Sequence, residues 1–291
     1  MVKLIGTMLA LAALAALGIW LLWGNTALTA HEISVSSPRL PGAFDGLRIA
    51  QVSDLHNAQF GPDNASLLSL LEERAPDLIL LTGDLIDSRR TDVDTALAFA
   101  AGAARIAPTY YVPGNHEARL TSDFPRLEQG LGEAGVTVLR NGAVELERAG
   151  ETLRLLGIDD PDFGTWTGGA AGLSALLAGL GAGEGFTILL SHRPELFETY
   201  AAAGVDLAFT GHAHGGQVRL PFVGGLFAPH QGLFPRCDAG LYAAGAARMI
   251  VSRGLGNSII PLRVNNRPEL VVAELSRESG RDRPEKIRPE G

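Results

Sequence analysis

Short motifs that hold histidine, aspartate and asparagine recur along the chain, and they include five of its seven histidines. Oxygen and imidazole ligands of these types bind divalent metal ions. Two such ions, held roughly 3.5 to 4 Å apart around one bridging carboxylate, can clamp the attacking and leaving oxygens of a phosphoryl displacement. The motifs therefore predict a two-metal hydrolytic site. In chain order they are Asp54-x-His56, Gly83-Asp84, Gly114-Asn115-His116-Glu117, Ser191-His192 and Gly211-His212-x-His214.

Two of the motifs place potential ligands two residues apart. Side chains at this spacing on a strand project to the same side, so a single strand end can offer both Asp54 and His56. We expect neither this pair nor His212 and His214 to need a special backbone conformation. Asn115 is a neutral, weak ligand that leaves net positive charge on its metal ion, which favours ionisation of bound water.

The composition is consistent with a single catalytic domain. A chain of 291 residues with 46% apolar content can bury one large core. The net charge of −8, with no basic cluster, argues against a nucleic-acid partner or a polynucleotide substrate. The single cysteine, Cys237, excludes an intrachain disulfide, and nothing in the sequence predicts a protein partner.

Hydrophobic periodicity predicts an α/β fold after residue 46. Buried strands alternate with amphipathic helices, and the strands end directly before the ligand motifs. Open α/β sheets bind ligands at the carboxyl ends of their strands, so the predicted site falls where such folds place one. The predicted strands are Leu47–Val52, Leu78–Thr82 and Thr109–Val112, and the helices between them are Asn64–Arg74 and Val93–Arg105.

Later strands predict a second sheet, so that two sheets flanked by helices form the domain over residues 47–276. The segment 31–46 is predicted to be a linker because Ser36–Gly42 is rich in turn-forming residues. Gly168–Gly185 is predicted to hold a surface helix, and the charged residues 277–291 a disordered tail. The predicted later strands are Val136–Leu139, Val144–Glu147, Leu153–Ile158, Phe186–Leu190, Leu207–Thr210, Arg248–Ser252 and Leu270–Leu275.

The first 30 residues are predicted to form a transmembrane anchor. The uncharged stretch Leu4–Trp23 would span about 30 Å as a helix, the thickness of a hydrocarbon core. A cleavable signal peptide is the alternative, although its apolar region is shorter and ends in a small-x-small site that Leu28-Thr29-Ala30 fits poorly. Lys3 before the stretch and Glu32 after it predict a single-pass protein of the bacterial inner membrane with an extracytoplasmic domain.

Taken together, the motifs resemble those of the calcineurin-like metallophosphoesterases, over roughly Leu47 to Ser276. The resemblance implies the fold of this family, in which helices flank two sheets, and a set of ligands for each of two metal ions. One metal ion would be held by Asp54, His56, Asp84 and His214, and the other by Asp84, Asn115, His192 and His212. It also implies that His116 faces the leaving group or a phosphoryl oxygen and that Asp87 orients it. A carboxylate partner favours the imidazolium form that proton donation requires. A capping or solvated carboxylate is the alternative for Asp87.

One position departs from the protein phosphatases of this family. They carry a phosphate-gripping arginine directly after the second aspartate of Gly-Asp-x-x-Asp, whereas this chain has Ser88 there, followed by Arg89 and Arg90. Protein phosphatase activity is therefore disfavoured. Arg89 and Arg90 could reach phosphate or lie on a solvated face.

The stretch from Gly215 to Tyr242 is predicted to form a long loop beside the site. Its His-Gly-Gly-Gln start resembles the membrane-associated branch of YkuE and YaeI type and a UDP-2,3-diacylglucosamine pyrophosphatase. We assign His230 to this loop and not to the metal site. Two alternatives stand for Phe222, Phe227 and Phe234, which either tuck the loop against the core or contact a lipid.

The sequence thus predicts a membrane-anchored phosphoesterase with two divalent ions, for which manganese, iron and zinc are equally suitable. It would cleave a phosphodiester or pyrophosphate, lipid-linked as in lipid A precursors, by attack of a metal-bridged hydroxide. The alternatives are a soluble phosphomonoester or nucleotide as substrate, or a non-catalytic scaffold. A nucleotide-linked lipid would be met in the cytoplasm, which conflicts with the predicted topology.

Overall fold

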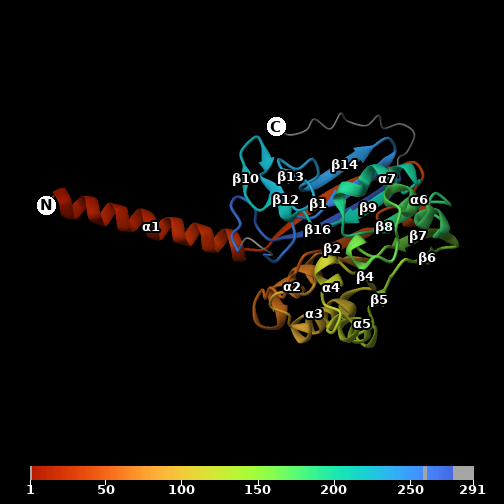
Figure 1. The fold of residues 1–291 in the computed structure, drawn as a ribbon, viewed down its shortest axis with the longest axis horizontal. Helices are drawn as coiled ribbons and strands as arrows, with labels where there is room; N and C mark the ends of the chain where they lie inside the picture. Colours follow the sequence, from red (N-terminus) through yellow and green to blue (C-terminus); the bar gives the residue numbers. More distant parts are fainter. Residues whose placement is uncertain (1, 258–260, 278–291) are drawn as a thin grey trace.

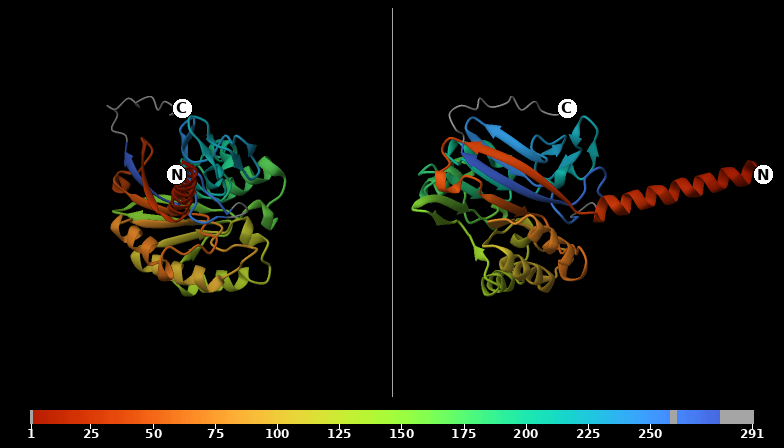
Figure 2. Two further views of the ribbon diagram at one scale, coloured as in Figure 1. Left: turned by 90° about the vertical axis from the view of Figure 1, so that its left-hand side faces the viewer. Right: turned by 180° about the vertical axis from the view of Figure 1, so that it is seen from behind.

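Two six-stranded sheets lie face to face in the computed structural model, which describes residues 2–257 and 261–277, and helices cover both outer faces (Figures 1 and 2). This arrangement confirms the predicted fold class. The predicted tail beyond Arg277 lies outside the described residues.

The first sheet has the strand order β1-β16-β2-β3-β4-β5. Strands β2 to β5 are parallel, β16 is antiparallel to β2, and β1 is parallel to β16. Its strands are β1 (Thr29–Ser37), β2 (Arg48–Val52), β3 (Leu78–Thr82), β4 (Thr109–Val112), β5 (Thr137–Val138) and β16 (Glu269–Arg277), and its helices are α2 (Ala65–Glu73), α3 (Val93–Ile106), α4 (Asn115–Ala118) and α5 (Phe124–Glu133).

The second sheet has the order β14-β15-β9-β8-β7-β6, and two short hairpins lie beside it. The segment from Gly215 to Tyr242, predicted to be a loop, holds these hairpins and the start of β14. The strands of this sheet are β6 (Gly142–Arg148), β7 (Glu151–Gly157), β8 (Thr187–Leu190), β9 (Leu207–Thr210), β14 (Gly240–Ala244) and β15 (Ala247–Val251), with helices α6 (Gly169–Gly179) and α7 (Phe197–Ala202). The hairpins are β10 (Arg219–Leu220) with β11 (Gly224–Gly225) and β12 (Phe227–Ala228) with β13 (Gly232–Leu233).

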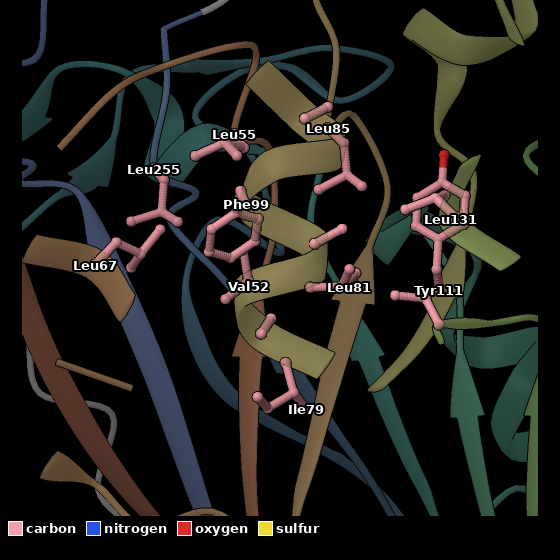
Figure 3. Packing of buried hydrophobic residues seen from close by; sticks show 14 of the residues in the cluster. Val52, Leu55, Leu67, Ile79, Leu81, Leu85, Phe99, Tyr111, Leu131 and Leu255 are labelled. Atoms are coloured by element: carbon pink, nitrogen blue, oxygen red, sulfur yellow. The ribbon is translucent and has the colours of Figure 1, made fainter. Parts of the chain in front are cut away.

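Three apolar layers hold the domain together. One fills the space between the first sheet and its helices, where Phe99 of α3 and Leu81 of β3 are buried (Figure 3). A second lies between the sheets and includes Ile49 and Phe209. A third packs the second sheet against α6 and α7. Because β3 is buried on both faces, it is an unbroken apolar run, as is typical of a central parallel strand.

Three sequence predictions require correction. Residues 136–139 and 270–275 were predicted to join the second sheet, but the strands there, β5 and β16, belong to the first. The predicted linker over 31–46 is also wrong in its first part, because residues up to Ser37 form strand β1. Val35 and Ile33 of this strand pack into the layer between the sheets, which explains why the segment is ordered as an edge strand.

The N-terminal helix α1 (Val2–Thr26) projects away from the domain (Figures 1 and 2). It is the one helix among the described residues that is long and apolar enough to cross a membrane. Only Ala27 and Leu28 separate it from β1, and its last turn is tied to the domain. Asn25 accepts a hydrogen bond from the Arg263 backbone nitrogen at 2.8 Å, and the Arg267 guanidinium lies 4.5 Å from the centre of the Trp23 ring.

Candidate metal centre

The predicted ligands come from both sheets and meet at one edge of the domain. Asp54 and His56 follow β2, Asp84 follows β3, and Asn115 follows β4. His192 follows β8, while His212 and His214 follow β9. All seven side chains are buried. The carboxyl ends of parallel strands therefore converge on one cluster, as the sequence predicts.

The first group of ligand atoms surrounds Nε2 of His214. This nitrogen lies 3.3 Å from Oδ1 of Asp54 and 3.2 Å from Nε2 of His56. Nε2 of His56 is in turn 3.6 Å from Oδ2 of Asp84. Asp54, His56 and His214 are thus close enough to hold a single ion together.

The second group lies on the other side of Asp84. Oδ2 of Asp84 is 3.2 Å from Nε2 of His192, which is 3.1 Å from Nδ1 of His212 and 3.2 Å from Oδ1 of Asn115. The same oxygen of Asp84 faces both groups, so this carboxylate lies between them. The two groups contain the same residues as the two predicted ligand sets.

These spacings fit divalent metal ions. Ligand atoms that lie about 2.0 to 2.2 Å from one ion are themselves about 3 to 3.5 Å apart. The distance between Nε2 of His56 and Nε2 of His214 falls in this range. Two unprotonated imidazole nitrogens cannot hydrogen-bond to each other, so a shared metal ion fits this spacing and a hydrogen bond does not. The donor set therefore indicates divalent metal ions and leaves their identity open.

The backbone at the ligands contradicts one prediction. Asp54, His56, Asp84, His212 and His214 have φ angles of 52°, 46°, 53°, 66° and 49°. This left-handed region is costly for residues with a side chain, and such residues cluster at functional sites. The expectation that the Asp-x-His and His-x-His pairs need no special backbone is therefore wrong. The strands have already ended at these residues, and left-handed turns aim the side chains at a common point.

Hydrogen bonds orient the ligands and set their protonation. Nδ1 of His192 donates to the Thr82 carbonyl at 2.8 Å, which leaves Nε2 to face the cluster. Burial lowers the pKa of His56 and of His214 to about 3 and outweighs the opposing effects of Asp84 and Asp54, so both present a free lone pair. Burial acts in the same direction on His192, but Asp84 and Asp54 outweigh it and raise the pKa of His192 to about 10. The carboxylates thus favour a positive charge at this position, which a bound cation would supply in place of the proton on Nε2.

Glu117 holds two of the motif loops together, a role that the sequence analysis did not assign. Its carboxylate is buried and accepts three backbone hydrogen bonds, from the nitrogens of Asp84 at 2.9 Å, Gly114 at 2.8 Å and Ile86 at 3.1 Å. Gly114 allows this close approach, because a Cβ atom there would lie 2.8 Å from the Asp84 nitrogen. Burial and the charge of Asp84 raise the pKa of Glu117, while the backbone donors stabilise its ionised form.

We expect Glu117→Gln to lower the free energy of unfolding by about 1 to 3 kcal/mol, because its amide group would face a backbone N–H that has lost its acceptor. Metal affinity should fall by roughly 10- to 100-fold, since the loop that carries Asp84 loosens. Denaturant unfolding and metal competition with a chelator measure the two effects. Glu73→Gln on the exposed face of α2 is the matched control. Equal behaviour of both variants would show that Glu117 binds the loops in its neutral form.

His116 lies beside the first ligand group, with its ring centre 4.5 Å from that of His56. Nδ1 of His116 accepts a hydrogen bond from the Ser88 backbone nitrogen at 3.0 Å. Oδ2 of Asp87 lies 3.9 Å from Nδ1 of His116 and 3.6 Å from Nδ1 of His56. The other oxygen of Asp87 accepts from the backbone nitrogens of Arg89 and Arg90, so the carboxylate also caps its own turn.

Two further residues near the cluster were not foreseen. The buried guanidinium of Arg193 donates to both oxygens of Asp160, and its Nη1 lies 3.3 Å from Nε2 of His212. His230, which we assigned to the loop, places Nδ1 only 2.8 Å from the same nitrogen of His212. Neither contact has a signal in the sequence, since both arise from the packing of distant loops.

Comparison with known proteins agrees with this geometry. The family model for calcineurin-like phosphoesterases matches residues 47–216. The metallophosphoesterase YkuE of Bacillus subtilis is 32% identical over 84% of this chain and 84% of its own length. Phosphodiesterase YaeI of Escherichia coli is 34% identical over 78% of this chain and 82% of its own length. A transmembrane protein with a metallophosphoesterase domain from Danio rerio is 28% identical over 91% of this chain and 61% of its own length. The match to the family model over residues 47–216 and the two bacterial relatives show that this chain belongs to the calcineurin-like phosphoesterase family.

Proposed function

We propose that this metallophosphoesterase hydrolyses a phosphodiester or pyrophosphate bond of a lipid-linked substrate at a membrane surface. The observation that carries the hydrolytic part is the single Asp84 oxygen that faces two groups of ligand atoms, with His116 beside them. Bound divalent ions would activate water and polarise the phosphoryl group.

The ligand roles follow from the distances. Asp54, His56 and His214 would hold one ion, and Asn115, His192 and His212 the other. Asp84 would contact both. Manganese, iron and zinc all suit this mixture of imidazole and oxygen donors.

His116 is proposed to donate a proton, or a hydrogen bond from Nε2, to the leaving oxygen. The ring has a partner in either protonation state. The neutral ring accepts from the Ser88 N–H, whereas the imidazolium can turn Nδ1 toward Oδ2 of Asp87, which is buried and accepts no hydrogen bond among the described residues.

Three aromatic side chains of the segment that follows His214 are exposed. Phe222, Phe227 and Phe234 are 89%, 43% and 57% exposed, so they do not tuck the loop against the core. Phe227 begins β12 and Phe234 directly follows β13, and the turn between these strands holds His230, whose ring contacts His212. Exposed aromatic side chains next to a polar site suit a substrate with an apolar chain. Arg89 and Arg90 are exposed, which accords with a solvated face.

The strand register brings the site to the end of the domain that carries α1. Thr29, at the start of β1, pairs with Glu269, and β16 then pairs Val271 with Gln51 near the carboxyl end of β2. Asp54 follows three residues after Gln51. If α1 spans a membrane, the metal centre would therefore lie at the end of the domain that is nearer to the bilayer.

A panel of phosphodiesters, pyrophosphates and monoesters, assayed with added divalent metal, tests the proposed reaction. We expect turnover of diesters or pyrophosphates to exceed that of monoesters and to stop on chelation. A preference for soluble monoesters or nucleotides would contradict the proposed substrate class. Absence of metal-dependent turnover on every substrate would indicate a scaffold.

A triple variant, Phe222→Ser, Phe227→Ser and Phe234→Ser, tests the lipid part. We expect weaker turnover of lipid-linked substrates and unchanged turnover of small diesters, because the three rings are exposed. Equal losses on both kinds of substrate would show that the rings support the fold and not the substrate.

Removal of residues 1–27 is expected to yield a domain that stays in solution without detergent and hydrolyses small diesters at the full-length rate. The cut spares β1, which begins at Thr29 and pairs with β16 along its whole length. Ultracentrifugation and diester turnover measure the result. Aggregation or loss of small-diester activity would show that α1 is part of the folded domain.

The anchor is proposed to place the domain outside the cytoplasm of a bacterial cell, since Lys3 precedes the apolar stretch and Glu32 follows it. Protease treatment of intact spheroplasts tests this orientation. We expect cleavage before lysis, and cleavage only after lysis would place the domain in the cytoplasm.

A further inference from the structure

A cavity lies where α1 meets the domain. It measures about 310 Å³, within the range of roughly 300 to 1,000 Å³ that is typical of ligand sites. Arg253, Arg263 and Arg267 line it together with Trp20 and Trp23 of the helix. None of its described lining residues is acidic, although the chain carries a net charge of −8. The cavity thus gathers positive charge in an acidic protein.

Two of the three guanidinium groups have unused hydrogen-bond donors. Nη1 and Nη2 of Arg253 donate to no described residue, while its Nε forms an ion pair with Oε1 of Glu269 at 3.6 Å but no hydrogen bond. Arg267 uses Nε and Nη2 for the carbonyls of Ala27 and Leu28, which leaves Nη1 available. Arg263 differs from both, because the Asn257 side chain and backbone carbonyls engage all of its nitrogens. Arg253 and Arg267 can therefore bind an additional anion.

The position of the cavity along α1 indicates that the anion belongs to a membrane lipid. The apolar stretch from Leu4 to Trp23 matches the hydrocarbon core in length, which places Trp20 and Trp23 at the level of the lipid head groups. Both rings are partly exposed, at 40% and 51%. The exposed apolar residues Phe222 and Val223 follow Arg219, whose backbone nitrogen donates to the carbonyl of Val264, the residue between the lining residues Arg263 and Asn265. The same face of the domain thus combines interfacial aromatic, apolar and cationic groups.

We propose that this cavity binds the phosphate of an anionic phospholipid. Arginine binds phosphate through paired, charge-assisted hydrogen bonds, and tryptophan packs against the adjoining glycerol and acyl carbons. The site shares no residue with the metal centre, so it is a binding site beside the one that performs the reaction. The proposal rests on insertion of α1 in a membrane and does not require that the protein be a phosphodiesterase.

Quenching of tryptophan fluorescence in vesicles tests the site directly. The full-length protein is reconstituted with phosphatidylglycerol and phosphatidylcholine, and one of the two lipids carries brominated acyl chains. Bromine quenches Trp20 and Trp23 when its lipid occupies the cavity, whereas Trp166 in the soluble domain gives a constant background. Excess chelator prevents turnover, so failure of this test is separate from failure of the proposed reaction.

We expect the cavity to prefer phosphatidylglycerol over phosphatidylcholine by roughly fivefold for each of the two arginines that have unused donors, Arg253 and Arg267. Arg253→Gln should lower the preference about fivefold, and the double variant with Arg267→Gln should bring it close to parity. Arg105→Gln is the matched control. Arg105 lies in the last turn of α3, just before β4 begins, and therefore at the edge of the sheet opposite to the metal centre and α1.

Three results would overturn the proposal. The wild-type protein could show no preference, the preference could persist in Arg253→Gln, or Arg105→Gln could reduce it equally. A last measurement adds inorganic phosphate to the vesicles, with chloride at the same ionic strength as the control. We expect phosphate to leave the preference unchanged, and displacement of the lipid would assign the cavity to free phosphate instead. The double variant loses the Arg267 contacts to Ala27 and Leu28. If this loss destabilises the protein, the single variant Arg253→Gln still tests the proposal, because it keeps these contacts.

Discussion

Asp84→Asn is expected to abolish metal-dependent hydrolysis, with a loss of at least about 10³-fold in turnover, because both ions lose a ligand at once. Oδ2 of Asp84 faces Nε2 of His56 on one side and Nε2 of His192 on the other. Asparagine keeps the shape of the side chain but removes the negative charge that two cations share. Elemental analysis should therefore show that both ions are depleted, and not one alone.

Asp63→Asn is the matched control for this variant. Asp63 is exposed in the loop before α2 and has a left-handed backbone that asparagine also tolerates. It should keep full metal content and turnover. Two metal ions per chain together with full activity in Asp84→Asn would refute the bridging role of Asp84.

His116→Ala is expected to retain metal but to lose about 10² to 10⁴ in turnover, the usual contribution of a positioned acid. His116 lies close to His56 and Asp87 but belongs to neither of the two proposed ligand sets, and its backbone nitrogen donates to Oδ1 of Asp84 at 2.8 Å. Because this backbone contact survives the substitution, the Asp84 loop should stay in place. Turnover and metal content, measured on the same preparation, separate the two effects.

The leaving group distinguishes proton donation from a simple hydrogen bond. If His116 protonates the leaving oxygen, esters of nitrophenol should lose less activity than alkyl esters, since nitrophenolate departs without a proton. His116→Asn adds a second arm, because its amide can donate a hydrogen bond but cannot transfer a proton. Equal losses on both esters, with recovery in His116→Asn, would assign His116 to hydrogen bonding alone.

Much of the fold and the identity of the cluster could be predicted from the sequence. Leu78–Thr82 and Leu207–Thr210 are unbroken apolar runs next to glycine, and the observed strands β3 and β9 have the same bounds. The motifs after these runs meet because parallel strands bring their carboxyl ends to one edge. Residue type and strand order were thus sufficient to group Asp84 with the histidines.

What the sequence could not reveal depends on long-range packing or on weak local signals. Helix α5 was missed because Gly130 and Gly132 lower helix propensity, although Leu127 and Leu131 are buried. Edge strand β1 has polar residues at most positions, and its order comes from pairing with β16 at the far end of the chain.

The fine geometry of the site was also out of reach. Periodicity describes strands, whereas the left-handed φ of Asp54 and His212 arises in the turns that follow them. The contact between His230 and His212 joins two loops whose approach only the tertiary structure determines.

The central claim is that two divalent ions around Asp84 enable hydrolysis of a phosphodiester, and a metal titration tests it most directly. Metal-free protein is supplied with increasing Mn²⁺ while bound metal and the hydrolysis of bis(4-nitrophenyl) phosphate are measured together. We expect no turnover without metal and a rate that rises until about two ions are bound per chain. Full turnover in metal-free protein, or saturation of the rate at one ion per chain, would contradict the account.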